Sequence, residues 1–270
     1  MKKATAIVLA LLMVLSLAAC GSASSESKTL VMATSADYPP YEFIILDEKN
    51  EQQYVGIDIS VSEAIAADMG KELQVVNMDF DSLMAGLQKG DADMVLAAIE
   101  ITEERLEAAD FSDPYYTDLP PAILVKASNA ASYKTLADFA GKSVAAQTGT
   151  TKLDIVNDQL TGANAVPLQL VTDMVNELVN GKVDAIVVDG AVAKQYAETN
   201  KDLVIADASS ELGAAQPYCV AVAKGDPKGL LPAINAAIAK MNEENKLESF
   251  ISAADALKDV WQEVTAENPS

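Results

Sequence analysis

The residue best suited to bind an anion in this chain is its single arginine, Arg105, which stands among eighteen lysines. A guanidinium presents a planar fork that matches a carboxylate through two parallel hydrogen bonds, whereas the ammonium of lysine acts as a point charge. Glu103 and Glu104 directly precede Arg105, so an ion pair on a helix surface is an equally open interpretation. Composition alone therefore places Arg105 either in a carboxylate site or on a surface.

Two further segments offer polar groups where a predicted helix begins. Gly149-Thr150-Thr151 opens one helix, and the first N–H groups of a helix have no partner within it and attract anions. Asp189 follows the apolar run 185–188 and starts another helix, where aspartate commonly serves as the N-cap. These segments add an anion-binding helix end and one carboxylate to the candidate residues.

One residue type that is common in enzymes and metal sites is missing from the sequence. It contains no histidine, which is the commonest general base and metal ligand. Its two cysteines, Cys20 and Cys219, are far apart and match no metal-ligand spacing, and Cys219 is expected to be a buried small residue. We therefore expect no metal, no cofactor and no enzymatic activity.

From Thr29 onward, short apolar runs alternate with segments that have helical periodicity. One helix is expected to be capped by Asp58 and to end at Gly70, with Ile59 and Ile65 on its apolar face. Strands are predicted over 30–33, 73–76, 92–97, 143–146, 185–188 and 219–223, and further helices over 82–89, 174–179 and 230–244. Strands that alternate with helices indicate an α/β architecture with mainly parallel sheets.

The alternation restarts in the second half of the chain, which predicts two lobes. Asp118-Leu119-Pro120-Pro121 interrupts the first series and is expected to cross between the lobes, and Gln216-Pro217-Tyr218 is expected to return. We assign residues 28–118 and 218–270 to lobe 1 and residues 119–217 to lobe 2. A cleft between two lobes is a common place for a small ligand to bind.

The N-terminal residues have the pattern of a secretion signal. Two lysines precede the apolar run 4–17, which is too short for a comfortable membrane span. The run ends at Leu17-Ala18-Ala19-Cys20, which resembles a bacterial lipobox, where the cysteine is lipidated after cleavage. We expect a signal peptide at 1–19, a lipidated Cys20 and a flexible tether over 20–27. An ordinary signal peptide with a chance cysteine is the alternative.

The chain is strongly acidic, with 40 Asp and Glu against 19 Lys and Arg and a net charge of −21. Such a field repels phosphate backbones, so we expect no nucleic-acid partner. The simplest interpretation is a charge that keeps a surface protein soluble, and attraction of cationic solutes is the alternative.

Five motifs, in order along the chain, resemble the bacterial solute-binding proteins of family 3, the polar amino acid group. They are the segments 38–43 (YPPYEF), 56–59 (GIDI), 101–116 (ITEER with FSDPYY), 147–151 (QTGTT) and 182–189 (KVDA with VD). The resemblance covers residues 28 to about 257. It implies a two-lobed α/β fold of the type II periplasmic-binding-protein kind, each lobe having a mainly parallel sheet flanked by helices.

The same resemblance implies a role and a location. The chain is expected to be the extracellular binding component of an amino acid ABC importer. Its implied partners are a free amino acid, the permease subunits of the transporter, and the membrane through the lipid anchor at Cys20. The expected location is the extracellular face of the cell membrane of a Gram-positive bacterium, and the expected state is a monomer.

The resemblance also assigns roles to individual residues. It places Arg105 and the backbone N–H groups around Thr150 and Thr151 on the ligand carboxylate, and Asp189 and Ala98 on the ligand ammonium. It places the ligand side chain against Tyr38, Phe80, Asp37, Glu100 and Gln147. For Tyr38 and Phe80, ordinary core packing is the alternative interpretation.

One departure from the family pattern bears on the substrate. Glu100 stands where the family usually has Thr or Ser, whose hydroxyl helps to bind the ligand carboxylate. An ionised Glu100 is expected instead to pair with Arg105, to compete with the ligand, or to face a cationic ligand group. Together with Asp37 and the acidic composition, it favours arginine or lysine as the substrate.

Three alternatives remain open at this point. The same role for glutamine, cystine or another polar neutral amino acid is the nearest one. A dehydratase-like enzyme on the same fold would use Glu100 and Asp189 as an acid–base pair. An extracellular sensor module is the third.

Overall fold

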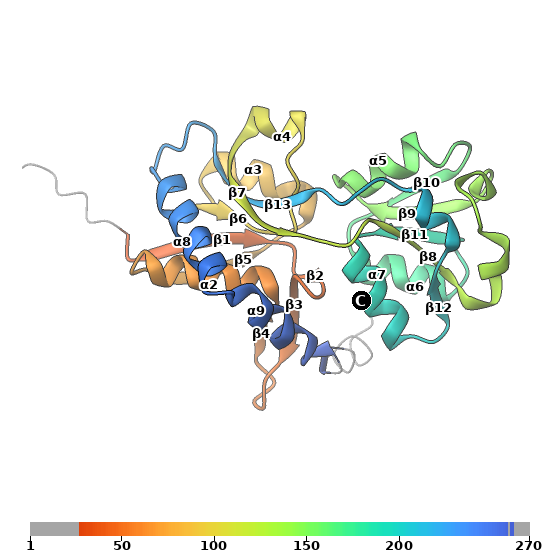
Figure 1. The fold of residues 1–270 in the computed structure, drawn as a ribbon, viewed down its shortest axis with the longest axis horizontal. Coiled ribbons are helices and arrows are strands. Elements are labelled where there is room, and N and C mark those ends of the chain that lie inside the picture. The colour runs from red at the N-terminus through yellow and green to blue at the C-terminus, as the bar shows by residue number, and fades with distance from the viewer. Residues whose placement is uncertain (1–26, 259, 262–270) are drawn as a thin grey trace, which may run out of the picture.

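The protein is described by a computed structural model that covers residues 27–258, 260 and 261. Two five-stranded sheets, each flanked by helices, form two lobes that lie beside one another (Figure 1). This is the two-lobed α/β architecture expected from the alternation of strands and helices. The predicted signal peptide 1–19, the lipidation site Cys20 and nearly all of the tether 20–27 lie outside the described residues.

Lobe 1 contains the sheet with the strand order β5-β1-β6-β13-β7. Its strands are β1 (Thr29–Thr34), β5 (Glu72–Asn77), β6 (Met94–Val95), β7 (Ala109–Thr117) and β13 (Pro217–Ala223). Its helices are α2 (Ile57–Asp68), α3 (Leu83–Lys89), α4 (Glu103–Ala108), α8 (Leu231–Glu243) and α9 (Lys246–Asp255), with the short helix η1 (Phe80–Ser82). The helices α2, α8 and α9 pack against one another.

Lobe 2 contains the sheet with the strand order β10-β9-β11-β8-β12. Its strands are β8 (Ala122–Lys126), β9 (Ser143–Gln147), β10 (Asn164–Leu168), β11 (Ala185–Val188) and β12 (Leu203–Ile205). Its helices are α5 (Thr151–Asp158), α6 (Val171–Val179) and α7 (Gly190–Thr199), with the short helices η2 (Ala127–Ser132), η3 (Leu136–Phe139) and η4 (Asp207–Glu211).

The two sheets share one pattern of strand directions. Among the strands of the described residues, only β13 in lobe 1 and only β8 in lobe 2 run against their neighbours. Both reversed strands are the first strand that the chain forms after it crosses from the other lobe. Because β8 and β13 start between the lobes, they run away from the cleft, and the parallel strands run toward it.

These directions decide where the polar loops lie. The carboxyl ends of β1, β5 and β6 lead into residues that face lobe 2, and those of β9 and β11 lead into residues that face lobe 1. In open α/β sheets, ligands bind beyond the carboxyl ends of the strands. The fold therefore brings two sets of strand ends together at one place.

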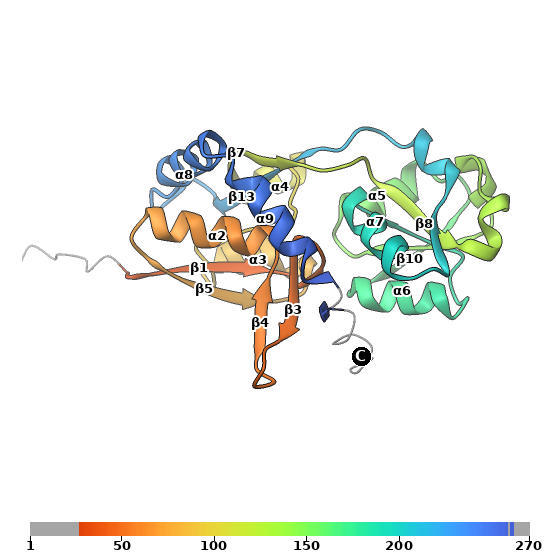
Figure 2. The ribbon, with the colours of Figure 1, turned by 60° about the horizontal axis from the view of Figure 1, so that its bottom comes forward.

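A small antiparallel sheet extends lobe 1 and belongs to neither large sheet. It consists of β2 (Asp37–Tyr38), β3 (Glu42–Leu46) and β4 (Gln52–Val55), and the hairpin of β3 and β4 projects away from the body of the lobe (Figure 2). The short strand β2 comes directly after β1 and carries Tyr38 toward lobe 2.

Two chain segments connect the lobes, and they lie close together because β7 and β13 are paired antiparallel (Figure 1). The first segment, 118–121, joins β7 to β8, and the second joins η4 to β13. The first segment packs tightly on the start of α7, since a Cβ atom on Gly190 would lie 2.4 Å from the carbonyl oxygen of Pro120. Only glycine fits at this residue without moving the connection.

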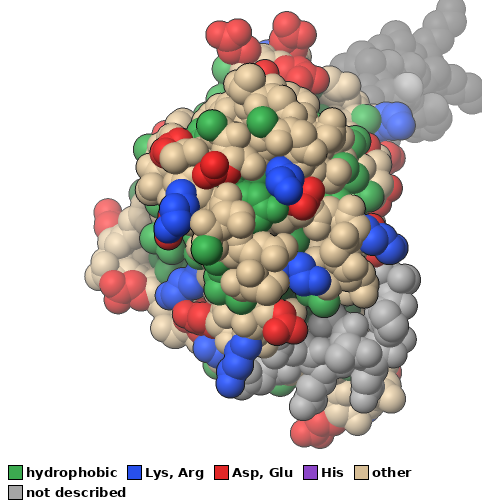
Figure 3. All heavy atoms as spheres, turned by 90° about the vertical axis from the view of Figure 1, so that its right-hand side faces the viewer, with side chains coloured by type: hydrophobic (Ala, Val, Ile, Leu, Met, Phe, Trp, Pro, Cys, Tyr) green, Lys and Arg blue, Asp and Glu red, His purple; other side chains and the backbone are tan. Residues whose placement is uncertain are grey.

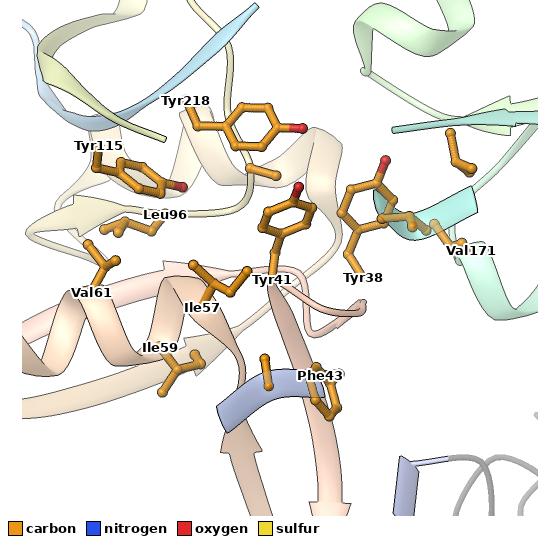
Figure 4. Close-up of a cluster of buried hydrophobic side chains, with 14 of the residues drawn as sticks. Tyr38, Tyr41, Phe43, Ile57, Ile59, Val61, Leu96, Tyr115, Val171 and Tyr218 are labelled. Atoms are coloured by element: carbon orange, nitrogen blue, oxygen red, sulfur yellow. The ribbon is translucent and has the colours of Figure 1, made fainter. Parts of the chain in front are cut away.

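The largest apolar cluster continues from one lobe to the other. Figure 4 shows Tyr41, Tyr115 and Tyr218 of lobe 1 packed near one another, with Tyr38 reaching toward Val171 of α6. The rings of Tyr41 and Tyr218 meet edge to face with centroids 5.3 Å apart, a favourable geometry for aromatic pairs. The lobes are thus joined by apolar packing as well as by the two connections.

Asp58 was expected to cap helix α2, and this prediction is wrong. The N-cap residue is Gly56, and Asp58 lies inside the first turn with its side chain fully buried. Its carboxylate accepts hydrogen bonds from the backbone N–H of Ala98, at 2.7 Å, and from the hydroxyl of Tyr115, at 2.8 Å. Asp58 therefore positions the backbone of Ala98 instead of the end of its own helix.

The surface mixes charges of both signs. Figure 3 shows the end of lobe 2, where Lys side chains lie scattered among Asp and Glu side chains. Within the described residues, no helix has both the length and the apolar character needed to cross a membrane.

The buried Asp58 predicts a specific dependence of stability on pH. Burial raises the pKa of Asp58 to about 6, so the folded protein retains a proton that the unfolded chain releases at a lower pH. This residue therefore makes the free energy of unfolding fall as the pH rises from about 4 to about 6. When the pH is lowered from about 7 to about 5, the wild type should gain more free energy of unfolding than Asp58→Asn. The difference between the two gains should be about 1 kcal/mol. Urea denaturation measures the difference; Asp91→Asn, at an exposed residue, is the control. Equal pH dependence in Asp58→Asn and the wild type would contradict the prediction.

Candidate functional site

A cavity between the lobes collects polar residues from both of them. Lobe 1 lines it with Tyr38, Phe80, Ala97, Ala98, Glu100 and Arg105, and lobe 2 lines it with Gln147, Thr150, Thr151, Lys152 and Asp189. The space between these residues is about 280 Å³ when the part open to solvent is included. Nine of the ten described residues that sequence reasoning assigned to ligand binding are in this lining.

Arg105 is a buried residue held by both lobes. Its guanidinium donates to the backbone carbonyl of Glu100 at 2.8 Å and to that of Gly149 at 3.1 Å. The guanidinium carbon lies 5.4 Å from the centre of the Phe80 ring, within range of a cation–π interaction. Burial lowers the pKa of Arg105. The alternative of a surface ion pair with Glu103 or Glu104 is therefore wrong, because the side chain points into the cavity lining.

Helix α4 fixes the backbone of Arg105. The hydroxyl of Thr102, the N-cap residue, accepts a hydrogen bond from the backbone N–H of Arg105 at 3.1 Å. The helix is only six residues long, so this cap contributes much of its stability. Within the described chain, no carboxylate lies within ion-pair distance of the guanidinium.

Helix α5 begins at the cavity, as the sequence predicted. Thr150 is its N-cap, and the Thr150 hydroxyl accepts from the N–H of Leu153 at 3.3 Å and donates to the carbonyl of Gln147 at 2.7 Å. Gly149 precedes it with a positive φ of 78°, a conformation that glycine adopts without strain. The first turn of α5 thus presents the start of a helix, a favourable place for an anion, to the interlobe space.

Asp189 lies at the N-cap position of α7, but its side chain does not cap the helix. Its carboxylate accepts a hydrogen bond from the Tyr38 hydroxyl at 2.7 Å, and its backbone N–H donates to the same hydroxyl at 2.9 Å. Burial, followed by the charge of Asp189, raises the pKa of Tyr38 well above its usual value. One hydroxyl of lobe 1 therefore satisfies two polar groups of a buried residue in lobe 2.

Glu100 was considered as a partner of Arg105, and its carboxylate binds elsewhere. It accepts a hydrogen bond from the Thr151 hydroxyl at 2.5 Å and forms an ion pair with the ammonium of Lys152 at 2.9 Å. Arg105 binds Glu100 through the backbone carbonyl of Glu100. Glu100 therefore makes a charged bond between the lobes.

Lys152 is the charged cavity residue that sequence reasoning missed, and Ala97 is the other lining residue that it did not assign to the ligand. The ammonium of Lys152 is buried and lies 2.6 Å from a carboxylate oxygen of Asp189 as well as 2.9 Å from Glu100. Burial lowers the pKa of Lys152, but the charges of Asp189 and Glu100 outweigh burial and raise it above its usual value. The signal that could have found this residue is Glu100 itself, since a buried carboxylate requires a cation nearby.

Three of the predicted residues have additional contacts that define their positions. Gln147 lines the cavity and donates through its amide to the carbonyl of Gln169 at 2.8 Å. Ala98 has a positive φ of 47°, and its backbone N–H is held by Asp58. Phe80 lines the cavity in the short helix η1 and lies against Arg105.

Asp37 is the predicted site residue that the structure places outside the cavity lining. Its carboxylate accepts a hydrogen bond from the backbone N–H of Val171 at 2.5 Å, at the start of α6. Burial raises the pKa of Asp37 to about 6. Asp37 therefore joins the lobes beside the site, because its carboxylate is bound to the first turn of a helix.

The arrangement is equipped to hold charges. It combines a guanidinium, an ammonium, two carboxylates and the start of a helix within one partly enclosed space. The described residues contain no group of three His, Cys, Asp or Glu side chains arranged to hold a metal ion.

Comparison with known proteins identifies the family. The model of the bacterial extracellular solute-binding proteins, family 3, matches residues 30–252. The chain belongs to this family. The relatives in this family are named for binding different amino acids, so the family by itself does not define the ligand.

Three relatives show the range of family 3 around this chain. The arginine-binding extracellular protein ArtP of Bacillus subtilis (strain 168) is 33% identical over 259 residues, covering 93% of this chain and 96% of that protein. The ABC transporter glutamine-binding protein GlnH of the same strain is 29% identical and covers the same shares. A crystal structure of an amino acid ABC transporter substrate-binding protein from Streptococcus pneumoniae, bound to L-arginine, is 36% identical with a TM-score of 0.79, covering 85% of this chain and 94% of that one.

The double role of the Tyr38 hydroxyl predicts a large effect of its removal. Tyr38→Phe leaves a carboxylate oxygen and the backbone N–H of Asp189 without this partner, which should lower the free energy of unfolding by about 1–3 kcal/mol. Tyr196→Phe is the matched control, because the buried Tyr196 hydroxyl has no hydrogen-bond partner within the described residues. Urea denaturation of both variants should show a loss for Tyr38→Phe and almost none for Tyr196→Phe; similar losses in both would refute this account.

Proposed function

We propose that this protein is the substrate-binding component of an amino acid ABC importer and that it binds one free amino acid between its lobes. The observation that carries the proposal is that Arg105 and Asp189, both buried, line one cavity from opposite lobes. A free amino acid presents a carboxylate and an ammonium on the same carbon. Burying either charge without a partner costs several kcal/mol, so a site for it needs one cationic and one anionic group.

Arg105 suits the ligand carboxylate. A guanidinium has five N–H donors, and its bonds to two backbone carbonyls do not use all of them. The others can bind a carboxylate. The first turn of α5 at Thr150 and Thr151 adds a second group that favours an anion. We assign the ligand ammonium to Asp189 together with the backbone of Ala98, and the ligand side chain to the walls formed by Tyr38 and Phe80.

Binding in such a cleft requires the lobes to separate and to close. We assign this motion to the two connections, with lobe 1 formed by residues 28–118 and 218–270 and lobe 2 by residues 119–217. A ligand that contacts both lobes stabilises the state in which they meet, and this differential affinity shifts the population.

Arginine or lysine is the substrate that we favour. Two relatives support this assignment, since ArtP is named as arginine-binding and the protein of Streptococcus pneumoniae was crystallised with L-arginine. The two carboxylates of Glu100 and Asp189 in the cavity also support it. The aromatic ring of Tyr38 or Phe80 is a suitable neighbour for a cationic side chain. Asp37 has no part in this assignment. Glutamine, cystine or another polar neutral amino acid is the alternative, and GlnH is the relative that supports it.

A dehydratase-like activity has less support. It would use Glu100 and Asp189 as an acid–base pair, but both carboxylates are bound to the ammonium of Lys152. We therefore propose binding and release without a chemical step.

The location follows from the N-terminal pattern, which lies outside the described residues. We propose a lipid anchor at Cys20, a monomeric binding unit on the extracellular face of a Gram-positive cell membrane, and docking on permease subunits. Stable anchoring by lipid chains requires more than one chain, which a lipidated N-terminal cysteine provides.

Titration calorimetry on ligand-stripped protein against all twenty amino acids tests the function. We expect heat of binding from arginine or lysine, because a cation gains from the two cavity carboxylates. Tighter binding of glutamate or leucine than of arginine would rule out the cationic assignment. No binding of any amino acid would overturn the proposed function itself.

Arg105→Lys tests the carboxylate site. A point charge replaces a bidentate fork, so the affinity for the ligand should fall by about 1–3 kcal/mol in binding free energy. Calorimetry measures the loss, and thermal unfolding confirms that the variant is folded. Unchanged affinity in a folded variant would remove Arg105 from the site.

A further inference from the structure

The ammonium of Lys152 occupies the position between the two carboxylates of the cavity. Glu100 belongs to lobe 1, while Lys152 and Asp189 belong to lobe 2, so the ion pair at 2.9 Å crosses between the lobes and the pair at 2.6 Å does not. All three side chains are at most 8% exposed. Lys152 thus binds the acceptor that the proposed function assigns to the ligand ammonium.

The charges of the cavity make the position of Lys152 decisive for the ligand. Arg105 and Lys152 are cations, Glu100 and Asp189 are anions, and together they sum to zero. If the ammonium of Lys152 stays in place, a ligand without net charge keeps this balance. If it leaves, the remaining groups sum to −1, and a ligand with a charge of +1 restores neutrality. A buried site strongly favours the neutral combination.

A second cavity beside the candidate site can receive the side chain of Lys152. It adjoins the first cavity, and Glu100, Thr151 and Lys152 line both of them. Its lining includes Asp154 and Asp158 from helix α5. Lys152 therefore lies at the boundary between the candidate site and an outer cavity that carries two carboxylates of its own.

We propose that Lys152 determines ligand specificity as a tethered cation: it competes with the cationic group of the ligand for Asp189 and Glu100 and is displaced into the outer cavity when a cationic amino acid binds. This inference rests on the proposed function and adds the residue that selects the charge of the ligand. Until displacement, the Lys152–Glu100 ion pair holds the lobes together, and Lys152 occupies the carboxylates of Glu100 and Asp189 that a cationic group of the ligand would bind.

Two features distinguish this role from that of an ordinary ion pair. A buried ion pair contributes little net stability, because desolvation offsets its attraction. This pair also places two buried charges of opposite sign, Glu100 of lobe 1 and Lys152 of lobe 2, directly against each other. The pair lies on the proposed binding residues themselves, where it changes what can bind.

The test uses Lys152→Met, which keeps the apolar stem and removes the ammonium. The variant leaves Glu100 and Asp189 facing each other across the interface without their shared cation. Calorimetry should show arginine binding to Lys152→Met about tenfold more tightly than to the wild type, because the competing cation is gone. Small-angle X-ray scattering of the ligand-stripped proteins should show a larger radius of gyration for the variant, since the two carboxylates repel.

Control variants separate this role from general effects of charge. Lys142→Met removes a half-exposed lysine of lobe 2 that pairs with Asp184 at 3.9 Å, and it should leave both measurements unchanged. Lys152→Gln keeps a polar group between the carboxylates and should change both measurements in the same direction as Lys152→Met, which guards against one misfolded variant.

The outcomes decide between the two proposals. Weaker or unchanged arginine binding by folded Lys152→Met and Lys152→Gln would overturn the role of Lys152 and leave the proposed function standing. If the wild type and both variants bind no amino acid, the proposed function fails; scattering then still tests the ion pair, and an equal radius of gyration in all proteins would overturn its role in holding the lobes together.

Discussion

A carboxylate that is removed from water needs partners, and Asp189 obtains them from both lobes. Lobe 1 supplies the hydroxyl of Tyr38, and lobe 2 supplies the ammonium of Lys152. The same Tyr38 hydroxyl accepts the backbone N–H of Asp189, so the residue is held at its side chain and its main chain. The rest of the cavity is arranged around this constraint, because any ligand that binds here has to preserve or replace these bonds.

The strand directions explain why so many polar groups meet at one place. Four strands of each sheet run toward the other lobe, and the single reversed strand in each, β8 or β13, is the one that enters from the crossing. The loops that follow the carboxyl ends of these strands therefore lie at the cleft and carry their polar groups into it. Lobe 1 adds β2 as an extra strand, and that strand carries the tyrosine that reaches Asp189.

Much of the fold and of the site could be predicted from the sequence. Apolar periodicity indicated the α/β lobes, and motif resemblance selected residues such as Arg105 and Asp189 that do line the cavity. The role of Asp58 could not be predicted, because an aspartate near a helix start reads as a cap unless its distant partners Ala98 and Tyr115 are known. A local sequence pattern gives information only about residues that are close along the chain. The contacts of Asp58 join residues that are far apart in the sequence, so the pattern does not reveal them.

Lys152 was missed for a related reason. In a chain with eighteen lysines, one more lysine after a helix start reads as a surface charge. Its burial is decided by the carboxylates of Glu100 and Asp189, which come from other segments of the chain. Asp37 differs from Lys152, since its place in the sequence suggested a ligand contact, while the structure shows its carboxylate bound to the first turn of α6.

The tight packing at Gly190 has a mechanical consequence. Gly190 directly follows Asp189 and leaves no room for a side chain against the connection at Pro120, while the carboxylate of Asp118 accepts the N–H of Ala191 at 3.2 Å. Any bend in residues 118–121 is therefore transmitted to the backbone that carries the central carboxylate. Substitutions in the connecting segment 118–121 can therefore change ligand binding without altering any residue that lines the cavity.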